Sequence, residues 1–306
     1  MQKVIIIGAN GFIGSKLSLA LADRGYNVVA FVDKRFNYDS LRNKNNVLTQ
    51  EFELESLESY YDLPCVSDAD TLYNMAWVGV NASMRNAFMD QLKNVEYYLR
   101  VLLFAEHHGI SRVIIPGSAS EVSCGNGAIT GNETPAPSDI YSSAKVAARY
   151  MSQTFARQHG ISLIWTLITS LYGPGRDDNS IIPYTIKTLL AGQKPSFTKL
   201  EQRWDFMYID DLIDAFIALG EKGNNGKIYP IGSGEHRQIK DFVEIIRDKI
   251  DKELLLGLGE LPYKNANKID NQIMDIHDLV IDTGFQAKVP FEKGIEITIN
   301  YFRNQQ

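Results

Sequence analysis

The chain has 306 residues, 44% of them hydrophobic, which is enough for a large core in one two-lobed unit or two closely joined domains. Its formal net charge is −6 at pH 7 with no basic block, which argues against a nucleic-acid partner. The two cysteines, Cys65 and Cys124, form no C-x-x-C pair, so we expect reduced thiols and no structural metal site.

Short apolar runs alternate with helical patterns along the first half of the chain. Strands are predicted at residues 4–7, 27–32, 71–75, 112–115 and 162–168, a weaker one near 47–50, and helices at 12–24, 85–108 and 139–159. This alternation predicts right-handed βαβ units and an α/β fold, a Rossmann-type doubly wound parallel sheet. Because no apolar run approaches the ~20 residues that cross a bilayer, and the first run is too short for a signal peptide, we expect a cytoplasmic protein without a membrane partner.

The later part of the chain is less regular and predicts a smaller, interleaved C-terminal substrate-binding lobe. A loop at 173–178, a strand at 227–230 and helices at 212–219, 238–250 and 291–303 are predicted. We assign residues 1–168 plus 206–232 to a dinucleotide-binding domain and 169–205 plus 233–306 to the lobe. Asp210 and Asp211 can suggest a metal, but Asp before an apolar helix is more typical of an N-cap.

A glycine-rich turn follows the first strand. Gly8, Gly11 and Gly14 let the backbone approach a pyrophosphate, whose charge then faces the helix N-terminus. Phe12 and Ile13 complete this expected cofactor-binding turn. An ordinary strand–helix turn is the alternative reading, since G-x-x-G-x-x-G alone is weak evidence.

The end of the second strand bears on the choice of cofactor. Asp33 lies about 20 residues beyond the turn, where a carboxylate can accept hydrogen bonds from the adenosine ribose of NAD. Lys34 and Arg35 can instead neutralise the 2′-phosphate of NADP. Both cofactors remain open, and we favour NAD.

A proton-transfer site is indicated by Tyr141 and Lys145, which lie four residues apart and thus one turn apart on one helix face. The ammonium group favours the phenolate form of the tyrosine. Ser118 follows the strand at 112–115, so its hydroxyl is expected at a strand's carboxyl end, where open α/β sheets bind ligands. A serine hydrolase is disfavoured because Gly117-Ser118-Ala119 is not G-x-S-x-G and no His follows closely.

These motifs resemble the extended short-chain dehydrogenases/reductases of nucleotide-sugar metabolism, a family of epimerases, dehydratases and 4-ketoreductases. The resemblance covers nearly the whole chain and rests on residues 8–14, 94–95, 117–121, 141–145, 171–175, 204–211, 229–234 and 274–303. It implies that Ser118, Tyr141 and Lys145 form the catalytic triad and that Tyr141 and Lys145 also bind the cofactor. Asn94 resembles the helix asparagine that shapes the family's site.

The chain departs from the family pattern at several positions. Asn-Met-Ala-Trp at residues 74–77 replaces a frequent His-Leu-Ala, and we expect Ala76 and Trp77 of this segment in the cofactor site. The dehydratases carry Asp-Glu just after the triad hydroxyl, where Ala119 and Ser120 stand, which argues against a dehydratase. Because Ser120 stands beside the expected triad serine, we expect it to contact the substrate.

Further substrate residues are expected from the resemblance in and around the lobe. Ser170 replaces a substrate-contacting Asn, and Trp204 replaces a phosphate-binding Arg. Ser196 and Phe197 are expected beside the nucleotide base. The expected cations for the diphosphate are Arg203 and Arg237. For each of these residues an ordinary surface role is the alternative.

Together these features predict an NAD(P)-dependent oxidoreductase acting at carbon 4 of a nucleotide-activated sugar, a small-molecule partner. Reduction of a 4-keto-6-deoxyhexose is favoured, a nucleotide-sugar 4-epimerase is the alternative, and a nonenzymatic dinucleotide-binding sensor is a third reading. The resemblance also implies a homodimer formed through the helices at 85–108 and 139–159.

Overall fold

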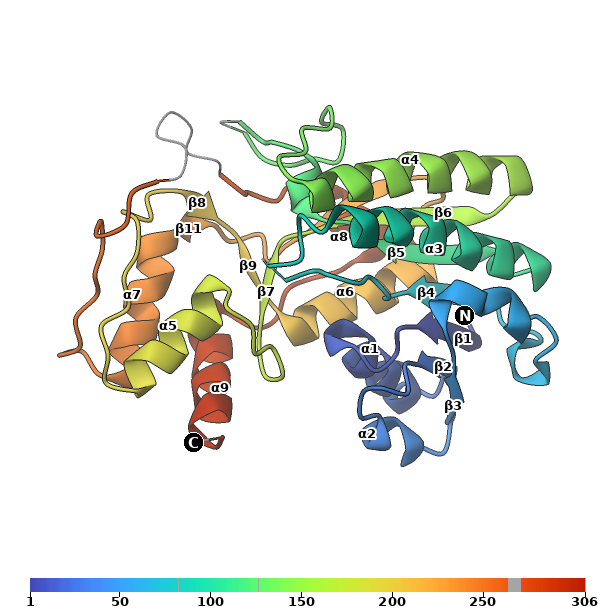
Figure 1. Ribbon diagram of the computed structural model, residues 1–306, viewed down its shortest axis with the longest axis horizontal. Coiled ribbons are helices and arrows are strands. Elements are labelled where there is room, and N and C mark those ends of the chain that lie inside the picture. Colours follow the sequence, from blue (N-terminus) through green and yellow to red (C-terminus); the bar gives the residue numbers. More distant parts are fainter. Residues whose placement is uncertain (82, 126, 264–270, 306) are drawn as a thin grey trace.

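The fold is built on a seven-stranded parallel sheet (Figure 1). The computed structural model describes residues 1–81, 83–125, 127–263 and 271–305. The strand order across the sheet is β3 (Val47–Glu51), β2 (Asn27–Val32), β1 (Lys3–Ile7), β4 (Thr71–Asn74), β5 (Arg112–Pro116), β6 (Ser162–Ile168) and β10 (Ile228–Ile231). The predicted Rossmann-type doubly wound sheet is confirmed.

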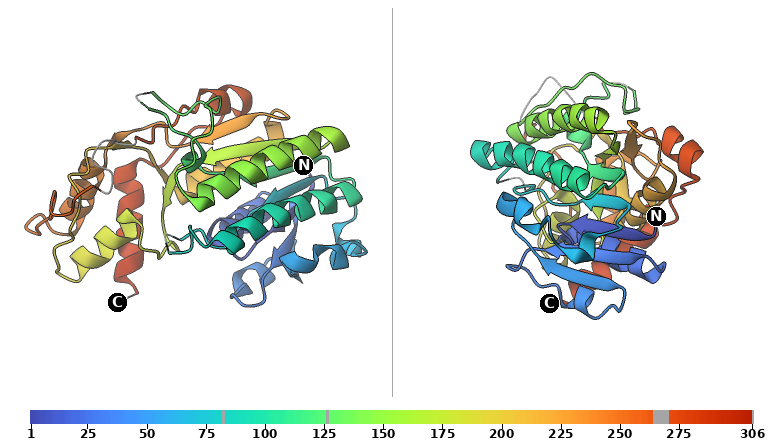
Figure 2. Two further views of the ribbon diagram at one scale, coloured as in Figure 1. Left: turned by 45° about the horizontal axis from the view of Figure 1, so that its top comes forward. Right: turned by 90° about the vertical axis from the view of Figure 1, so that its right-hand side faces the viewer.

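Helices cover both faces of the sheet. Successive side chains of β1 point to opposite faces, so each face has an apolar surface for helices to pack on. Val4 and Ile6 pack in the core with α1 (Phe12–Asp23) and α6 (Ile209–Lys222), whereas Ile5 and Ile7 pack in the core with α3 (Phe88–His107) and α4 (Ile140–His159). Helices α3 and α4 run side by side on their face (Figure 2). Short elements complete this region: α2 (Asp39–Arg42) and the 3₁₀ turns η1 (Leu54–Tyr60), η2 (Pro64–Val66) and η3 (Ala119–Glu121).

The second lobe lies at the carboxyl side of the sheet (Figure 1). It contains α5 (Ile181–Leu190), α7 (Ile239–Ile250), α9 (Phe291–Arg303) and the antiparallel pair β8 (Arg203–Trp204) and β11 (Arg237–Gln238). The parallel pair β7 (Ser170–Tyr172) and β9 (Phe206–Tyr208) joins it to the sheet, and α8 (His277–Thr283) packs on α6 and β10. The chain thus enters the lobe after β6 and returns to the sheet at β10.

Most predicted elements are present, and the differences have local causes. Helix α3 begins at Phe88 rather than at 85, because the preceding residues form turns that the backbone and side chain of Asn81 hold. The prediction of an Asp N-cap for α6 is wrong, since Tyr208 is the N-cap. Asp211 instead accepts the amides of Lys288 and Val289, both at 3.0 Å, and so fixes the approach to α9. In the described part of the chain, none of the helices has the length and apolar character to cross a membrane.

Candidate active site

The glycine turn connects the carboxyl end of β1 to α1. Gly8 has a φ of +78°, and the amides of Gly8 and Ala9 donate to the Phe31 carbonyl oxygen at 3.1 and 2.9 Å. Gly11 is the N-cap residue of α1, and no side chain in the described structure caps that helix. The first-turn amides therefore lack intrahelical acceptors and present the positive end of the helix dipole to an anion.

The three glycines differ in the space around them. A Cβ at Gly8 would lie 2.8 Å from the Ala76 amide nitrogen, and one at Gly14 would lie 2.2 Å from the Gly8 carbonyl oxygen. A Cβ at Gly11 would meet one described atom within 4 Å, the Gly8 carbonyl oxygen at 3.4 Å. The fold thus requires glycine at positions 8 and 14, whereas the room at Gly11 is a cradle that a side chain would fill, as a closely approaching pyrophosphate requires.

Asp33 directly follows β2 and is tied to the glycine turn by a residue that the sequence did not single out. The Asn10 side chain donates to the Asp33 carbonyl at 2.8 Å and accepts the Asp33 amide at 3.1 Å. Arg35 hydrogen-bonds the Asp33 carboxylate, which lowers the pKa of that group, and Lys34 pairs with Glu53 at 3.3 Å. Both neighbouring cations are therefore matched by carboxylates, which favours a ribose hydroxyl over a 2′-phosphate here.

Ser118, Tyr141 and Lys145 converge beyond the carboxyl end of β5. Helix α4 starts at Ile140, with Asp139 as its N-cap in a reciprocal pair of hydrogen bonds with Ser142. This start turns Tyr141 and Lys145 inward, where they are 8% and 3% exposed. The Ser118 hydroxyl lies close enough to the Tyr141 phenol to lower the pKa of that group, and the Lys145 ammonium lies 5.9 Å from the centre of the Tyr141 ring.

The Lys145 ammonium is held in a largely aromatic environment. It donates to the Tyr98 hydroxyl at 3.0 Å and to the Pro116 carbonyl at 2.8 Å, and it lies 3.7 Å from the centre of the Trp77 ring. Burial lowers the pKa of Lys145, and the negative charge of Glu121 opposes this effect. The two oxygen acceptors and the aromatic face stabilise the charged amine in a place where water cannot.

The phenol of Tyr141 is subject to opposing influences. Burial is the largest influence and leaves the pKa of Tyr141 above its ordinary value, although the Ser118 hydroxyl and the charge of Arg85 lower it. The Arg85 guanidinium carbon lies 4.2 Å from the centre of the Tyr141 ring. Ser118 and Arg85 therefore act against burial, in the direction that proton transfer near neutral pH requires.

Helix α3 shapes the segment that follows β4. Asn94 accepts the Val78 amide and donates to the Val78 carbonyl, each at 2.8 Å. Trp77 donates from Nε1 to the Gln91 side chain at 2.9 Å. These bonds hold Trp77 against Lys145 and keep the Ala76 backbone beside Gly8, so the predicted cofactor residues from β4 reach the same region as the glycine turn.

Three neighbours of the triad were not predicted: Arg85, Tyr98 and Glu121. Arg85 belongs to no predicted motif, and Tyr98 was not among the expected site residues. Glu121 was quoted only within a longer motif, and it is fully buried, where its carboxylate accepts the Ser118 amide at 2.8 Å and lies 3.4 Å from Arg149. Three residues after an N-cap serine, a glutamate is typical of a capping box, which is the signal that could have revealed its role.

Two of the expected substrate residues lie near the triad or at the junction of the lobes. The Ser120 hydroxyl is 2.9 Å from the Ser118 hydroxyl. Ser170 begins β7, and its hydroxyl accepts a hydrogen bond from Trp204 Nε1 at 3.0 Å. The indole that replaces a family arginine is thus bound to the serine that replaces a family asparagine, which gives this junction a different polarity from the family pattern.

The residues expected beside the base lie differently from the expectation. Phe197 is 4% exposed and packs with Leu200 and Val243 in a small core of the lobe, so burial removes it from a stacking position. Ser196 donates from its hydroxyl to Glu260 at 2.7 Å.

The two arginines expected to bind the diphosphate differ in their ion pairing and exposure. Arg237 pairs with both Glu235 and Glu292, so its charge is already compensated within the protein. Arg203 lies at the exposed edge of β8. Of the two, the exposed Arg203 is better placed to meet an incoming anion.

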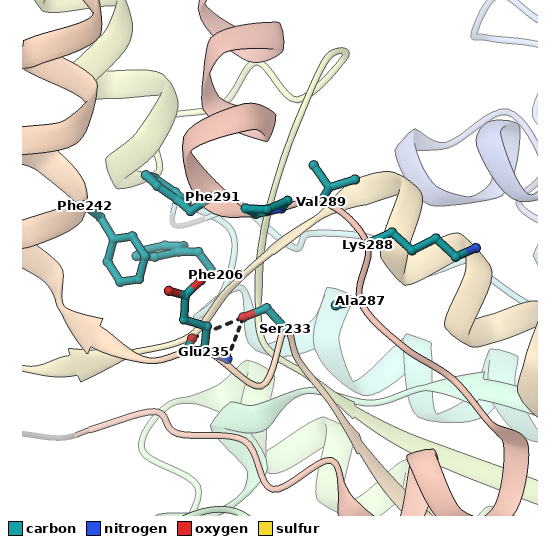
Figure 3. Close-up of a pocket in the computed structure, with 9 residues that line it drawn as sticks. Phe206, Ser233, Glu235, Phe242, Ala287, Lys288, Val289 and Phe291 are labelled. Atoms are coloured by element: carbon teal, nitrogen blue, oxygen red, sulfur yellow. Dashed lines mark hydrogen bonds between the residues drawn. The ribbon is translucent and has the colours of Figure 1, made fainter.

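A cavity of about 200 Å³ lies in the second lobe, outside the triad (Figure 3). Its lining comprises Phe206, Ser233, Glu235, Phe242, Ala287, Lys288, Val289, Pro290 and Phe291. Figure 3 shows the Phe rings grouped on one side, whereas Lys288 extends away from them. The Ser233 hydroxyl accepts the Glu235 amide at 3.0 Å, and Glu235 itself pairs with Arg237. Lys288 pairs with Asp214, so the charged side chains of this lining already have partners within the protein.

A family model described as the NAD dependent epimerase/dehydratase family matches residues 4–232 of this chain. The chain belongs to this family. Membership in the NAD dependent epimerase/dehydratase family confirms the resemblance to nucleotide-sugar enzymes of the extended short-chain type, and it agrees with the preference for NAD as cofactor. Across the described residues, no group of three or more His, Cys, Asp or Glu could hold a metal ion.

Relatives in the NAD dependent epimerase/dehydratase family span several activities. The dTDP-4-dehydro-6-deoxyglucose reductase of Escherichia coli is 26% identical over 98% of this chain and 97% of its own length. The dTDP-D-glucose 4,6-dehydratase of Bos taurus is 25% identical over 99% of this chain and 89% of its own. Among solved structures, the UDP-N-acetylglucosamine 4-epimerase from Methanobrevibacter ruminantium M1 superposes with a TM-score of 0.87 at 22% identity, over 100% of this chain and 99% of that one.

Proposed function

We propose that this chain is an NAD-dependent oxidoreductase acting at carbon 4 of a nucleotide-activated sugar, as a reductase of a 4-keto-6-deoxyhexose. The observation that carries the proposal is the convergence of the Ser118 hydroxyl and the Tyr141 phenol beside the buried ammonium of Lys145. The same crevice contains the cradle at Gly11, whose free space suits a pyrophosphate. The Escherichia coli reductase, similar over almost the full chain, supports the choice of reaction.

Residues of the glycine turn, and the residue that follows β2, are suited to hold the cofactor. The backbone around Gly11 would hold the pyrophosphate, Asp33 the adenosine ribose, and Tyr141 with Lys145 the nicotinamide end. Bound NADH supplies a hydride to carbon 4, and bound NAD⁺ accepts one in the reverse direction. The protein's task is to bind, orient and move a proton at the sugar oxygen.

The triad residues have distinct roles in that task. Tyr141 protonates the oxygen that becomes an alkoxide at carbon 4, and Ser118 donates a hydrogen bond to the same oxygen. Lys145 favours the phenolate that Tyr141 leaves behind. Ser120 and Ser170 would contact the sugar and Arg203 the diphosphate.

Elimination of a 6-hydroxyl does not fit the side chains around the triad. Ala119 is buried and carries no acid, and Ser120 offers only a hydroxyl. The nearby carboxylate of Glu121 is committed to the Ser118 amide and to Arg149. We therefore do not propose the activity that gives the Bos taurus relative its name.

A 4-epimerase is the second candidate, supported by the fold shared with the Methanobrevibacter enzyme. It would use the same three residues, first to oxidise and then to reduce carbon 4. A nonenzymatic sensor is a third candidate, but Tyr141 and Lys145 are both present and both in place, which gives it less support.

The purified chain should oxidise NADH in proportion to an added 4-keto-6-deoxyhexose linked to dTDP, UDP, GDP or CDP. The loss of near-ultraviolet absorbance of NADH measures this stoichiometry, and Tyr141→Phe serves as the control for adventitious reduction. Interconversion of 4-hydroxyl epimers without net NADH loss would identify an epimerase instead. Dinucleotide binding without turnover of any sugar would favour the sensor.

We further propose that two copies of the chain associate through α3 and α4. Leu92, Leu103, Tyr150 and Met151 are between 43% and 54% exposed on these adjacent helices, and apolar side chains gathered on one face are typical of interfaces. Leu103→Glu combined with Tyr150→Glu should shift the sedimentation mass from two chains to one. Leu255→Glu, at a 71% exposed site in the other lobe, is the matched control. A wild-type mass of one chain would contradict the proposal.

A further inference from the structure

We propose that Arg85 is a positioning residue of the proton-transfer site, which holds the Ser120 hydroxyl beside Ser118 and places its charge over the Tyr141 ring. This inference rests on the proposed role of Tyr141 as proton donor. Arg85 lies in the turns before α3, in none of the segments that carry the family resemblance. The tertiary structure alone brings it to the triad.

Contacts on two sides fix the Arg85 side chain. Its Nε donates to the Asp139 carboxylate at 2.7 Å and its Nη2 to the Ser120 hydroxyl at 3.4 Å. Its guanidinium carbon lies 4.2 Å from the centre of the Tyr141 ring, within the range of a cation–π contact. The side chain is 29% exposed, so it lies at the mouth of the site rather than in the core.

The Ser120 hydroxyl links Arg85 to Ser118. A guanidinium has donors and no acceptor, so Ser120 accepts from Arg85. The Ser120 and Ser118 hydroxyl oxygens are 2.9 Å apart, and the Ser118 oxygen also accepts the Ser120 amide at 3.2 Å. Arg85 thus holds the hydroxyl next to Ser118, and its charge over the Tyr141 ring favours the deprotonated phenol.

Other charged groups around Tyr141 do not replace Arg85. Glu121 and Asp139 act in the opposite direction and raise the pKa of Tyr141, whereas Arg85 and the Ser118 hydrogen bond lower it. The Lys145 ammonium is 5.9 Å from the ring centre and already donates to Tyr98 and Pro116. Arg85 is the cation closest to the ring among the described residues.

Titration of Tyr141 tests this inference directly. The readout is the ¹³Cζ NMR signal of labelled tyrosine in the protein with NAD bound, assigned by its loss in Tyr141→Phe. Arg85→Met should raise the apparent pKa of Tyr141 by about one unit or more, because it removes both the charge and the orienting donor. Ser120→Ala should raise it less, because the charge above the ring remains. Arg85→Lys should lie between wild type and Arg85→Met.

Arg100→Met is the matched control, since it removes an arginine from α3 that pairs with Glu58 and Glu96 rather than with groups of the triad. An unchanged Tyr141 titration in Arg85→Met, or an equal shift in Arg100→Met, would overturn the proposal. A loss of thermal stability without a titration shift would assign Arg85 a purely structural role. Should Arg85→Met fail to fold, Ser120→Ala decides alone. The readout needs no turnover, so it is distinguishable from failure of the proposed reaction.

Discussion

Tyr141→Phe should lower kcat by about 10²- to 10⁴-fold, the usual worth of a positioned general acid. The substitution removes one oxygen and keeps the ring, which packs 5.8 Å from the Trp77 ring and under Arg85. The reduced sugar oxygen then has no phenol to protonate it, whereas the glycine turn is unaffected. We therefore expect NAD affinity to stay within a few-fold of wild type.

Steady-state turnover and an NAD binding titration measure the two effects separately. Tyr301→Phe, on α9 and far from the triad in sequence, is the matched control and should leave both unchanged. If Tyr141→Phe retained most of its turnover on a sugar that the wild type reduces, Tyr141 would not be the proton donor. An equal loss of NAD binding would indicate that the phenol is needed for binding rather than for the chemical step.

Gly14→Ala should mainly lower the stability of the fold, whereas Gly11→Ala should mainly weaken the binding of NAD. An added methyl group at Gly14 would lie 2.2 Å from the Gly8 carbonyl oxygen, so Gly14→Ala should destabilise the fold by about 1–3 kcal/mol. Elsewhere in a helix this substitution usually stabilises by up to about 1 kcal/mol, which makes the sign informative. Gly11→Ala should change stability by less than about 1 kcal/mol but weaken NAD binding at least about tenfold, because its methyl group enters the cradle.

Urea unfolding without ligand and NAD titration of the folded protein test this pair. Each variant serves as the control of the other, since both change one glycine to alanine within the same turn. Stabilisation by Gly14→Ala would show that the turn can relax around a side chain. Unchanged NAD binding in Gly11→Ala would place the pyrophosphate elsewhere.

Short-range patterns account for the parts of the site that could be predicted. The i, i+4 spacing of Tyr141 and Lys145 needs only one helix, and the glycine turn needs only one strand and the helix that follows. Ser118 could be placed because parallel strands end at the same edge of a sheet. Helices α5 and α8 were missed, because α5 has only ten residues and α8 only seven, so each shows few turns of a periodic pattern.

Long-range contacts account for what was wrong or absent. Phe197 was expected beside a base, but it is a core residue because Leu200 and Val243 cover it. Asp211 was expected to cap its own helix, but it holds residues 288–289, which are distant in the sequence.

The amino-acid sequence by itself determined the alternation of strands and helices that gives the doubly wound sheet, the glycine turn and the helical spacing of phenol and amine, because each of these patterns lies within a short stretch of chain. Only the tertiary structure decided how the phenol is tuned. Arg85 and Tyr98 come from separate segments and meet the triad only after the helices pack on the sheet, whereas Glu121 reaches Ser118 through a local capping box. Charge acts through space rather than along the chain, so the spacing of residues in the sequence could not reveal Arg85 and Tyr98.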